Sequence, residues 1–257
     1  MHLLPLAFAA LLAQQPETMS LLKEPLYPPP LPRAERARLE DEASQARAEV
    51  SHDPSSAEAI LRLARAQRGL GLVGDSLETL TRALEGHADT PAIHLERGRG
   101  FIVIRKFDVA LREYRKAADA LPDAHCGSGL SLYLLADYLQ AHDEYAKCPD
   151  PGLFGYLAAR RAGVEAGPRP SPPDEAEAAP AITLPGSLTS KTPKGTGSIS
   201  GTYMEAVEAL LRNDKAAARD LLKPVLEKQE HRWMEPIYIA AEADYARIAP
   251  PTRKKKK

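Results

Sequence analysis

The residues with the most reactive chemistry in this 257-residue chain lie together at positions 125–129, which read His-Cys-Gly-Ser-Gly. A serine between glycines suggests a nucleophile, but the run lacks the Gly-x-Ser-x-Gly spacing of a nucleophile elbow. The surrounding pattern is helical, and a helix has no strained strand-to-helix turn that would present Ser128 to a substrate. We therefore expect no catalytic residue, and the sequence predicts that the protein is not an enzyme.

Metal and phosphate chemistry are also poorly supported. His94 and His125 occupy equivalent places in successive segments, but neither has a carboxylate or a third histidine at ligand spacing. Gly195, Gly197 and Gly201 follow no strand and have no Lys-Ser/Thr partner, so they do not make a phosphate loop. We expect no metal and no cofactor, and we favour packing between helices as the role of the two histidines.

The two cysteines, Cys126 and Cys148, are the only ones in the chain. They fall on the two helices of one predicted hairpin, whose turn lies near Asp137. Antiparallel pairing brings the start of one helix beside the end of the other. A disulfide here would close a loop of about 22 residues and stabilise the fold by roughly 3 kcal/mol. Two buried thiols that serve as small core residues are the alternative.

All these residues lie in segments that repeat. The first two copies are offset by 34 residues, and the third follows 31 residues later. Apolar and small positions correspond between copies: Val73, Ser76, Leu80, Ala83 and Ala88; Phe107, Ala110, Tyr114, Ala117 and Pro122; and Tyr138, Ala141, Tyr145 and Cys148. A period of this size is typical of stacked units that cannot bury their apolar faces alone. The sequence predicts an all-α fold, an α-solenoid of stacked antiparallel helix hairpins.

Composition agrees with this fold class and excludes some partners. Hydrophobic residues make up 44% of the chain and aromatics only 5%, which suits helices packed through small and medium side chains. The formal net charge is −1, so no global field would attract nucleic acid. Beyond residue 13 no apolar stretch approaches the ~20 residues of a membrane span. We expect neither a nucleic-acid partner nor a transmembrane helix.

The first residues indicate export. Leu3 to Ala13 form an apolar run that is too short to span a bilayer and is followed by polar residues, with a small side chain at a suitable cleavage position. We predict a signal peptide over 1–13 and a periplasmic or secreted location. No Lys or Arg precedes the run, so a disordered or weakly helical N-terminus is the alternative.

Prolines and glycines divide the rest of the chain. Residues 14–32 are predicted to be a Pro-rich extended connector. Residues 33–163 should hold a capping helix, three repeats and a following helix, with the repeats at 57–90, 91–121 and 122–150. The remaining predictions are a flexible linker rich in Pro, Ala, Ser and Gly over 164–200, a divergent helical hairpin with a capping helix over 201–249, and a basic tail over 250–257.

The three repeats resemble the tetratricopeptide repeat family, whose units are helical pairs with small residues at the crossing, aromatics after the turn and a closing proline. The second copy matches best, through Gly98, Phe101, Phe107, Ala110, Tyr114, Ala117 and Pro122. The others depart at Gln67, Ser76 and Cys148. The resemblance covers residues 57–148. It implies a right-handed superhelix that binds a peptide or protein in its concave face, rather than a reaction.

In that geometry the first helix of each unit lines the groove. The positions opposite its buried stripe carry arginines in the early units and apolar side chains in the later ones: Arg62, Arg65, Arg68, Arg99, Ile102, Leu130 and Tyr133. Because arginine forks bind carboxylates bidentately, this surface suits an extended peptide with a carboxylate at one end and apolar residues further on. The alternative is a solvated helix face on which Glu58 and Arg62 pair.

Three functions remain in view. The leading hypothesis is a non-catalytic scaffold that captures a protein or peptide segment in the cell envelope. The second is a structural, self-associating module in which end faces such as the helix at 151–163 stack between chains. The third is an undetected hydrolase or metal site.

Overall fold

The computed structural model describes residues 15–86, 88–170, 198–227 and 232–249. The predicted signal peptide, the basic tail and most of the predicted linker lie outside these ranges. The regular secondary structure within these ranges is almost entirely helical, which confirms the all-α prediction. The helices are α1 (Arg33–His52), α2 (Ala57–Gly69), α3 (Val73–Glu85), α4 (Pro91–Val103), α5 (Phe107–Ala117), α6 (Asp123–Leu134), α7 (Tyr138–Tyr145), α8 (Gly152–Ala162), α9 (Ile199–Leu211), α10 (Lys215–Leu226) and α12 (Pro236–Ile248).

Four helix pairs turn in the same way. The residue two positions before each second helix has a left-handed backbone, with φ of 81° at Gly71, 63° at Arg105, 66° at Ala136 and 59° at Asn213. In each turn this residue and the next donate their N–H groups back to the ending helix, which satisfies carbonyls that would otherwise lack partners. The divergent hairpin formed by α9 and α10 therefore shares the turn of the three predicted repeats.

Helix α8 ends as the first helix of a further unit would end. Gly163 has φ of 71°, and the N–H of Val164 donates to the carbonyl of Ala159 at 3.1 Å. Residues 164–170 are not helical, and this stretch contains Gly167, Pro168 and Pro170, which oppose helix formation. The unit that α8 begins is therefore interrupted after its first helix.

Glycines on the first helices allow neighbouring helices to approach one another. A Cβ atom at Gly98 would lie 2.7 Å from the ring of Tyr114, and one at Gly127 would lie 2.4 Å from the same ring. Gly129 has the same relation to Tyr145, at 2.8 Å. The aromatic side chains of α5 and α7 therefore occupy space that only a glycine leaves open, which is why these residue types recur between the second and third units.

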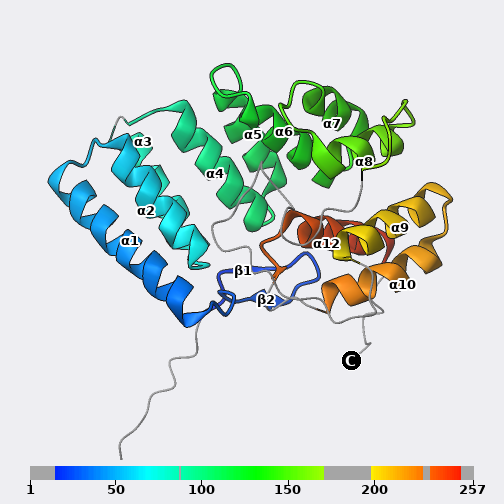
Figure 1. Cartoon of the computed structure of the whole chain (residues 1–257), viewed down its shortest axis with the longest axis horizontal. Coiled ribbons are helices and arrows are strands. Elements are labelled where there is room, and N and C mark those ends of the chain that lie inside the picture. Colours follow the sequence, from blue (N-terminus) through cyan, green and yellow to red (C-terminus); the bar gives the residue numbers. More distant parts are fainter. Residues whose placement is uncertain (1–14, 87, 171–197, 228–231, 250–257) are drawn as a thin grey trace, which may run out of the picture.

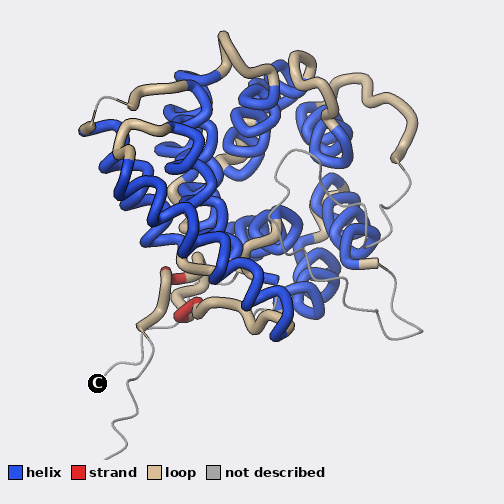
Figure 2. Tube along the Cα trace, turned by 60° about the vertical axis from the view of Figure 1, so that its left-hand side comes forward, coloured by secondary structure: helices blue, strands red, loops and turns tan. Residues whose placement is uncertain are grey.

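The helices follow one another along an arch from α1 to α8 (Figure 1). Figure 2 shows the arch from a second direction, with the two short strands at its lower edge. Helix α12 lies under the arch beside α9 and packs on α10, α9 and α6. Its residues 237–244 are all buried. The C-terminal helices therefore dock on the array rather than forming a separate lobe, and none of the helices in the described ranges is long and apolar enough to cross a bilayer.

The predicted connector at 14–32 has more structure than its prolines suggest. Strands β1 (Thr18–Met19) and β2 (Pro25–Leu26) form an antiparallel ribbon that turns through Lys23, whose φ is 66°. Leu26 is only 1% exposed and packs with Val73, Val103 and Trp233. The prediction of a simple connector is corrected by this apolar anchor, which brings together residues from both ends of the chain.

Candidate functional site

The structure separates the seven predicted groove residues into two sets. Arg62 and Arg65 keep side chains that are 36% and 43% exposed, and that of Arg99 is 14% exposed. The others are almost completely buried within the chain: Arg68, Ile102, Leu130 and Tyr133. The expectation that these four face a ligand is therefore contradicted. Ile102, Leu130 and Tyr133 belong to the same apolar cluster as residues of α9 and α12, while Arg68 lies beneath Glu96.

At the later end of the concave face, a closed network surrounds Asp244 of α12. Arg161 of α8 and Arg247 donate to its carboxylate at 2.7 and 2.9 Å, and Tyr203 of α9 donates at 2.8 Å. The hydroxyl of Tyr133 lies 3.0 Å from that of Tyr203 and also accepts from Arg161 at 3.1 Å. Burial raises the pKa of Tyr133 to about 12, so the phenol stays neutral. We name these five residues the closed end.

A second acidic residue of α12 pairs with the turn of the second unit. Glu242 is fully buried and accepts from Nε of Arg105 at 3.0 Å and from the backbone N–H of Leu21. The guanidinium of Arg105 also lies 5.6 Å from the ring centroid of Trp233. Acidic residues of α12 thus pair with Arg105 and Arg161 of the array, two arginines that the sequence analysis did not single out.

At the early end, three arginines share one carboxylate. Glu96 of α4 is fully buried, and it accepts from Arg65 at 2.8 Å, from Arg99 at 2.7 Å and from Arg68. Burial alone would raise the pKa of Glu96, but Arg68 and Arg99 outweigh that effect and lower it to about 2. Glu96 is therefore ionised, and the cluster of these four residues carries a formal charge of about +2. We name this cluster the open end, because Arg65 connects it to solvent.

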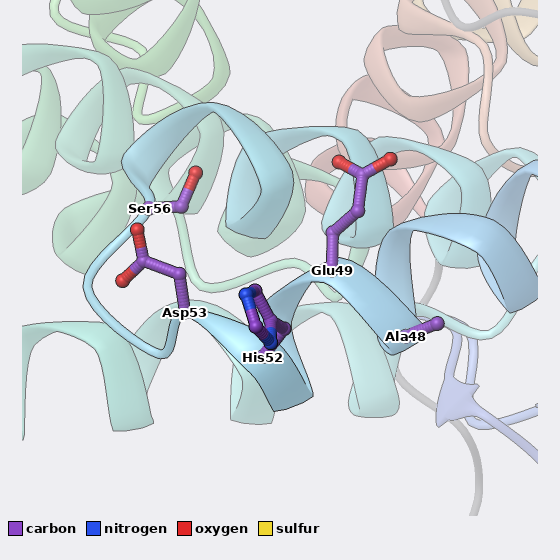
Figure 3. A pocket seen from close by; sticks show the side chains of 5 residues that line it. All are labelled: Ala48, Glu49, His52, Asp53 and Ser56. Carbon is purple, nitrogen blue, oxygen red and sulfur yellow. The ribbon is translucent and has the colours of Figure 1, made fainter.

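Arg62 pairs differently from the sequence-based alternative. Its guanidinium donates to Glu49 of α1 at 2.8 Å instead of forming the expected pair with Glu58. A shallow hollow of about 460 Å³ lies beside this pair (Figure 3), and it is lined by Ala48, Glu49, His52, Asp53 and Ser56. Asp53 is engaged locally, since its carboxylate accepts from the N–H of Ser55 at 3.0 Å. The hollow offers no convergent set of functional groups.

The two histidines pair within their own units. Nδ1 of His94 lies 2.7 Å from Glu113, and Nδ1 of His125 lies 2.8 Å from Glu144. Each glutamate stands 19 residues after its histidine, on the second helix of the same hairpin. Sequence reasoning missed these partners because it searched only at ligand spacing. The recurrence of glutamate with the same period was the available signal, and it indicates packing between helices.

The remaining residues that the sequence analysis singled out, Ser128 and the two cysteines, are buried in the interior of the protein. Ser128 lies within α6 and is fully buried, so it presents no hydroxyl to solvent. Cys126 and Cys148 form a disulfide, with Cα atoms 4.9 Å apart. Of the two states that the sequence left open, the structure has the bonded one. Within the described ranges no group of three His, Cys, Asp or Glu side chains is placed to hold a metal ion.

Comparison with known proteins gives little beyond this geometry. No family model matches the chain, and no curated protein matches it significantly. A solved tetratricopeptide repeat protein from Parabacteroides merdae ATCC 43184 is similar over 77% of this chain and 76% of its own, with 17% identity and a TM-score of 0.47. The repeat architecture described above rests on the chain's own turns and packing, not on that similarity.

Proposed function

We propose that the protein is a non-catalytic scaffold that binds an acidic segment of a partner protein at the open end of its concave face. The observation that carries the proposal is the exposed part of Arg65, which contacts the buried carboxylate of Glu96 through Nε while its side chain remains 43% exposed. Since an arginine fork can engage carboxylates from more than one direction, Arg65 has the chemistry to receive a second one.

The site is smaller than the groove that the sequence suggested. The apolar positions Ile102, Leu130 and Tyr133 are covered by the C-terminal helices, so they add no contact area to a ligand bound at the open end. Recognition would then be electrostatic and would weaken with salt, because partly exposed charges are screened. We expect modest affinity and fast exchange rather than permanent capture.

The proposal places the scaffold in the cell envelope. The apolar run at 3–13 supports export, and the disulfide between Cys126 and Cys148 supports an oxidising compartment. A fusion of residues 1–32 to a reporter that is active only after export tests this part. Retention of the reporter in the cytoplasm would contradict it.

Fluorescence anisotropy with a labelled ten-residue polyglutamate peptide tests the binding site. We expect saturable binding that weakens at least tenfold in Arg65→Glu, since the change reverses the exposed charge. The matched control is Arg82→Glu on α3, whose side chain is 75% exposed and pairs only with Glu78 among the described residues. Equal binding by the two variants would mean that the open end is not the binding site. If the wild-type protein shows no saturable binding, the whole proposal is refuted.

Self-association remains the second candidate because of one exposed feature. Leu135 and Leu139 flank the turn between α6 and α7 and are 43% and 56% exposed. The apolar side chains of α8, the helix expected to stack between chains, are buried or only partly exposed. Sedimentation velocity at increasing concentration distinguishes the two functions. If the protein forms a dimer and the substitution Leu139→Lys abolishes it, the structural role is favoured.

A further inference from the structure

Residues 15–32, here called the strap, connect the two ends of the fold. The strap precedes α1 and lies across the lower edge of the arch (Figure 1), where the first unit meets the C-terminal segment. Its side chains divide into those that contact the body and those that do not. Leu26 is 1% exposed, whereas Met19 and Tyr27 are 49% and 44% exposed. The body therefore contacts the strap at a few selected positions, in the manner of a bound peptide.

The main apolar anchor of the strap is Leu26. Leu26 inserts into a cluster that contains Val73 at the start of α3, Val103 at the end of α4, and Trp233 in the C-terminal segment. These three residues come from parts of the chain that are distant in sequence. The pocket for Leu26 thus exists only because the C-terminal segment has docked on the array.

Polar contacts fix the strap on either side of that leucine. The carboxylate of Glu17 accepts from the backbone N–H of Gly74 at 3.1 Å, in the first turn of α3, where helix N–H groups lack intrahelical partners. The indole N–H of Trp233 donates to the carbonyl of Tyr27 at 2.7 Å. One contact selects a negative charge, and the other needs only a main-chain carbonyl.

Two prolines complete the fit. Pro28 and Pro29 lie against Gly71, the left-handed residue of the first turn, where a Cβ would come within 2.7 Å of Pro29 Cδ. Prolines hold a peptide in an extended conformation before it binds, which lowers the entropy lost on docking. The strap therefore combines a carboxylate, a buried leucine, an accepting carbonyl and a proline pair, and extended proline-containing segments are one class of peptide that folded domains recognise.

We propose that this surface is a peptide-binding site, distinct from the open end, and that the strap is its resident ligand. The site takes an extended segment with the pattern Leu-x-Pro-Pro and a carboxylate upstream, supplied by a partner protein. Because the resident segment is tethered, its effective concentration is high and a free peptide competes poorly with it. An added ligand should therefore bind measurably once the resident leucine is weakened.

Tryptophan fluorescence gives a direct test, because Trp233 is the only tryptophan in the chain and is buried beneath the strap. In full-length Leu26→Asp we expect the emission maximum to shift to longer wavelength as the indole meets water. A synthetic peptide of residues 15–32 should restore the shorter wavelength in a saturable manner. The same peptide with Leu26→Asp should not restore it, and one with Glu17→Gln should bind at least threefold more weakly.

Two results would overturn the proposal. Unchanged emission in Leu26→Asp would mean that the leucine does not seal the site, and failure of the wild-type peptide to restore the signal would mean that the surface does not accept a segment in trans. Circular dichroism at 222 nm checks that the variant remains folded. Should Leu26→Asp lose its helical signal, Leu26→Ala with the same two peptides serves in its place, and the same outcomes apply.

Discussion

The open and closed ends of the concave face are built from the same ingredients and differ in what covers them. Each has a buried carboxylate that accepts hydrogen bonds from arginines: Glu96 at the open end and Asp244 at the closed end. At the closed end the carboxylate comes from α12, and its neighbours Tyr133 and Tyr203 complete a satisfied network. At the open end the carboxylate and all three arginines come from the array itself, and Arg65 reaches solvent.

The difference shows how a repeat array and its C-terminal helices share one surface. Where α9 and α12 dock, residues in groove positions become core. Where they do not, similar positions keep charge, and Arg62 and Arg65 also stay partly exposed although Arg68 is buried. The sequence of a single unit does not indicate whether its groove positions will be covered, because the covering helix α12 lies far away in the chain. The comparison therefore predicts a large structural effect at one end and a smaller effect, linked to binding, at the other.

The largest expected effect is at the closed end. Asp244→Ala would leave Arg161 buried against neutral partners, and removing one member of a buried ion pair costs about 3–5 kcal/mol. We expect this loss in the free energy of unfolding from urea titration at pH 7. The control is Glu208→Ala, which removes only a partly exposed pair with Arg160 between α8 and α9 and should cost less than about 1 kcal/mol. Similar costs for the two variants would contradict the description of a closed end.

A smaller effect, and one that depends on pH, is expected at the open end. The pKa of Glu96 is about 2 in the folded protein against 4.5 as its ordinary value. A lowered pKa means that its stabilisation is complete above about pH 4.5 and is lost as the pH falls towards about 2. Glu96→Gln should therefore cost about 3 kcal/mol at pH 7 and progressively less below pH 4.5. Urea midpoints from pH 7 to pH 3 check this, and a cost independent of pH would contradict it.

Much of the architecture was predictable from the period. The second helices of the three repeats begin at Val73, Phe107 and Tyr138, the positions from which the copies were aligned. The relation between Gly98 and Tyr114 explains why the alignment works: a missing Cβ and a large ring occupy complementary space. Local steric constraints of this kind are repeated in the sequence, so they can be read from it.

The covering of the concave face was not predicted, although one signal existed. Residues 237–244 are buried on all sides, and a helix that is apolar around most of its circumference belongs in a core. Glu242 and Asp244 interrupt that run, and buried acidic residues require cationic partners. Matching them with the surplus arginines of the array would have suggested docking. The partners of Leu26 could not be inferred, since its pocket forms from three distant segments.

The disulfide gives the next prediction, because it fixes α6, the helix that carries Tyr133, to the chain after α7. Replacing Cys126 and Cys148 with alanine removes a cross-link that closes a loop of 22 residues. We expect a loss of about 3 kcal/mol in the free energy of unfolding. Reduction of the wild-type protein with dithiothreitol should lower its free energy of unfolding by a comparable amount. The same treatment should leave the double variant unaffected. If dithiothreitol destabilises both proteins, the loss of stability does not come from this disulfide.

The smallest expected effect concerns the boundary between the two ends, where the ring of Tyr114 lies between Gly98 of α4 and Gly127 of α6. In Gly127→Ala the new Cβ would lie 2.4 Å from that ring, and overpacking of this kind costs about 1–3 kcal/mol. The better helix propensity of alanine offsets up to about 1 kcal/mol of this cost. The matched control is Gly74→Ala, where the nearest atom is 3.6 Å away and only the gain in propensity remains.

In a Tyr114→Leu background the ring is absent, so the cost of Gly127→Ala should largely disappear, and a double-mutant cycle measures this coupling. A cost that persists without the ring would mean that the new Cβ at position 127 meets something other than Tyr114.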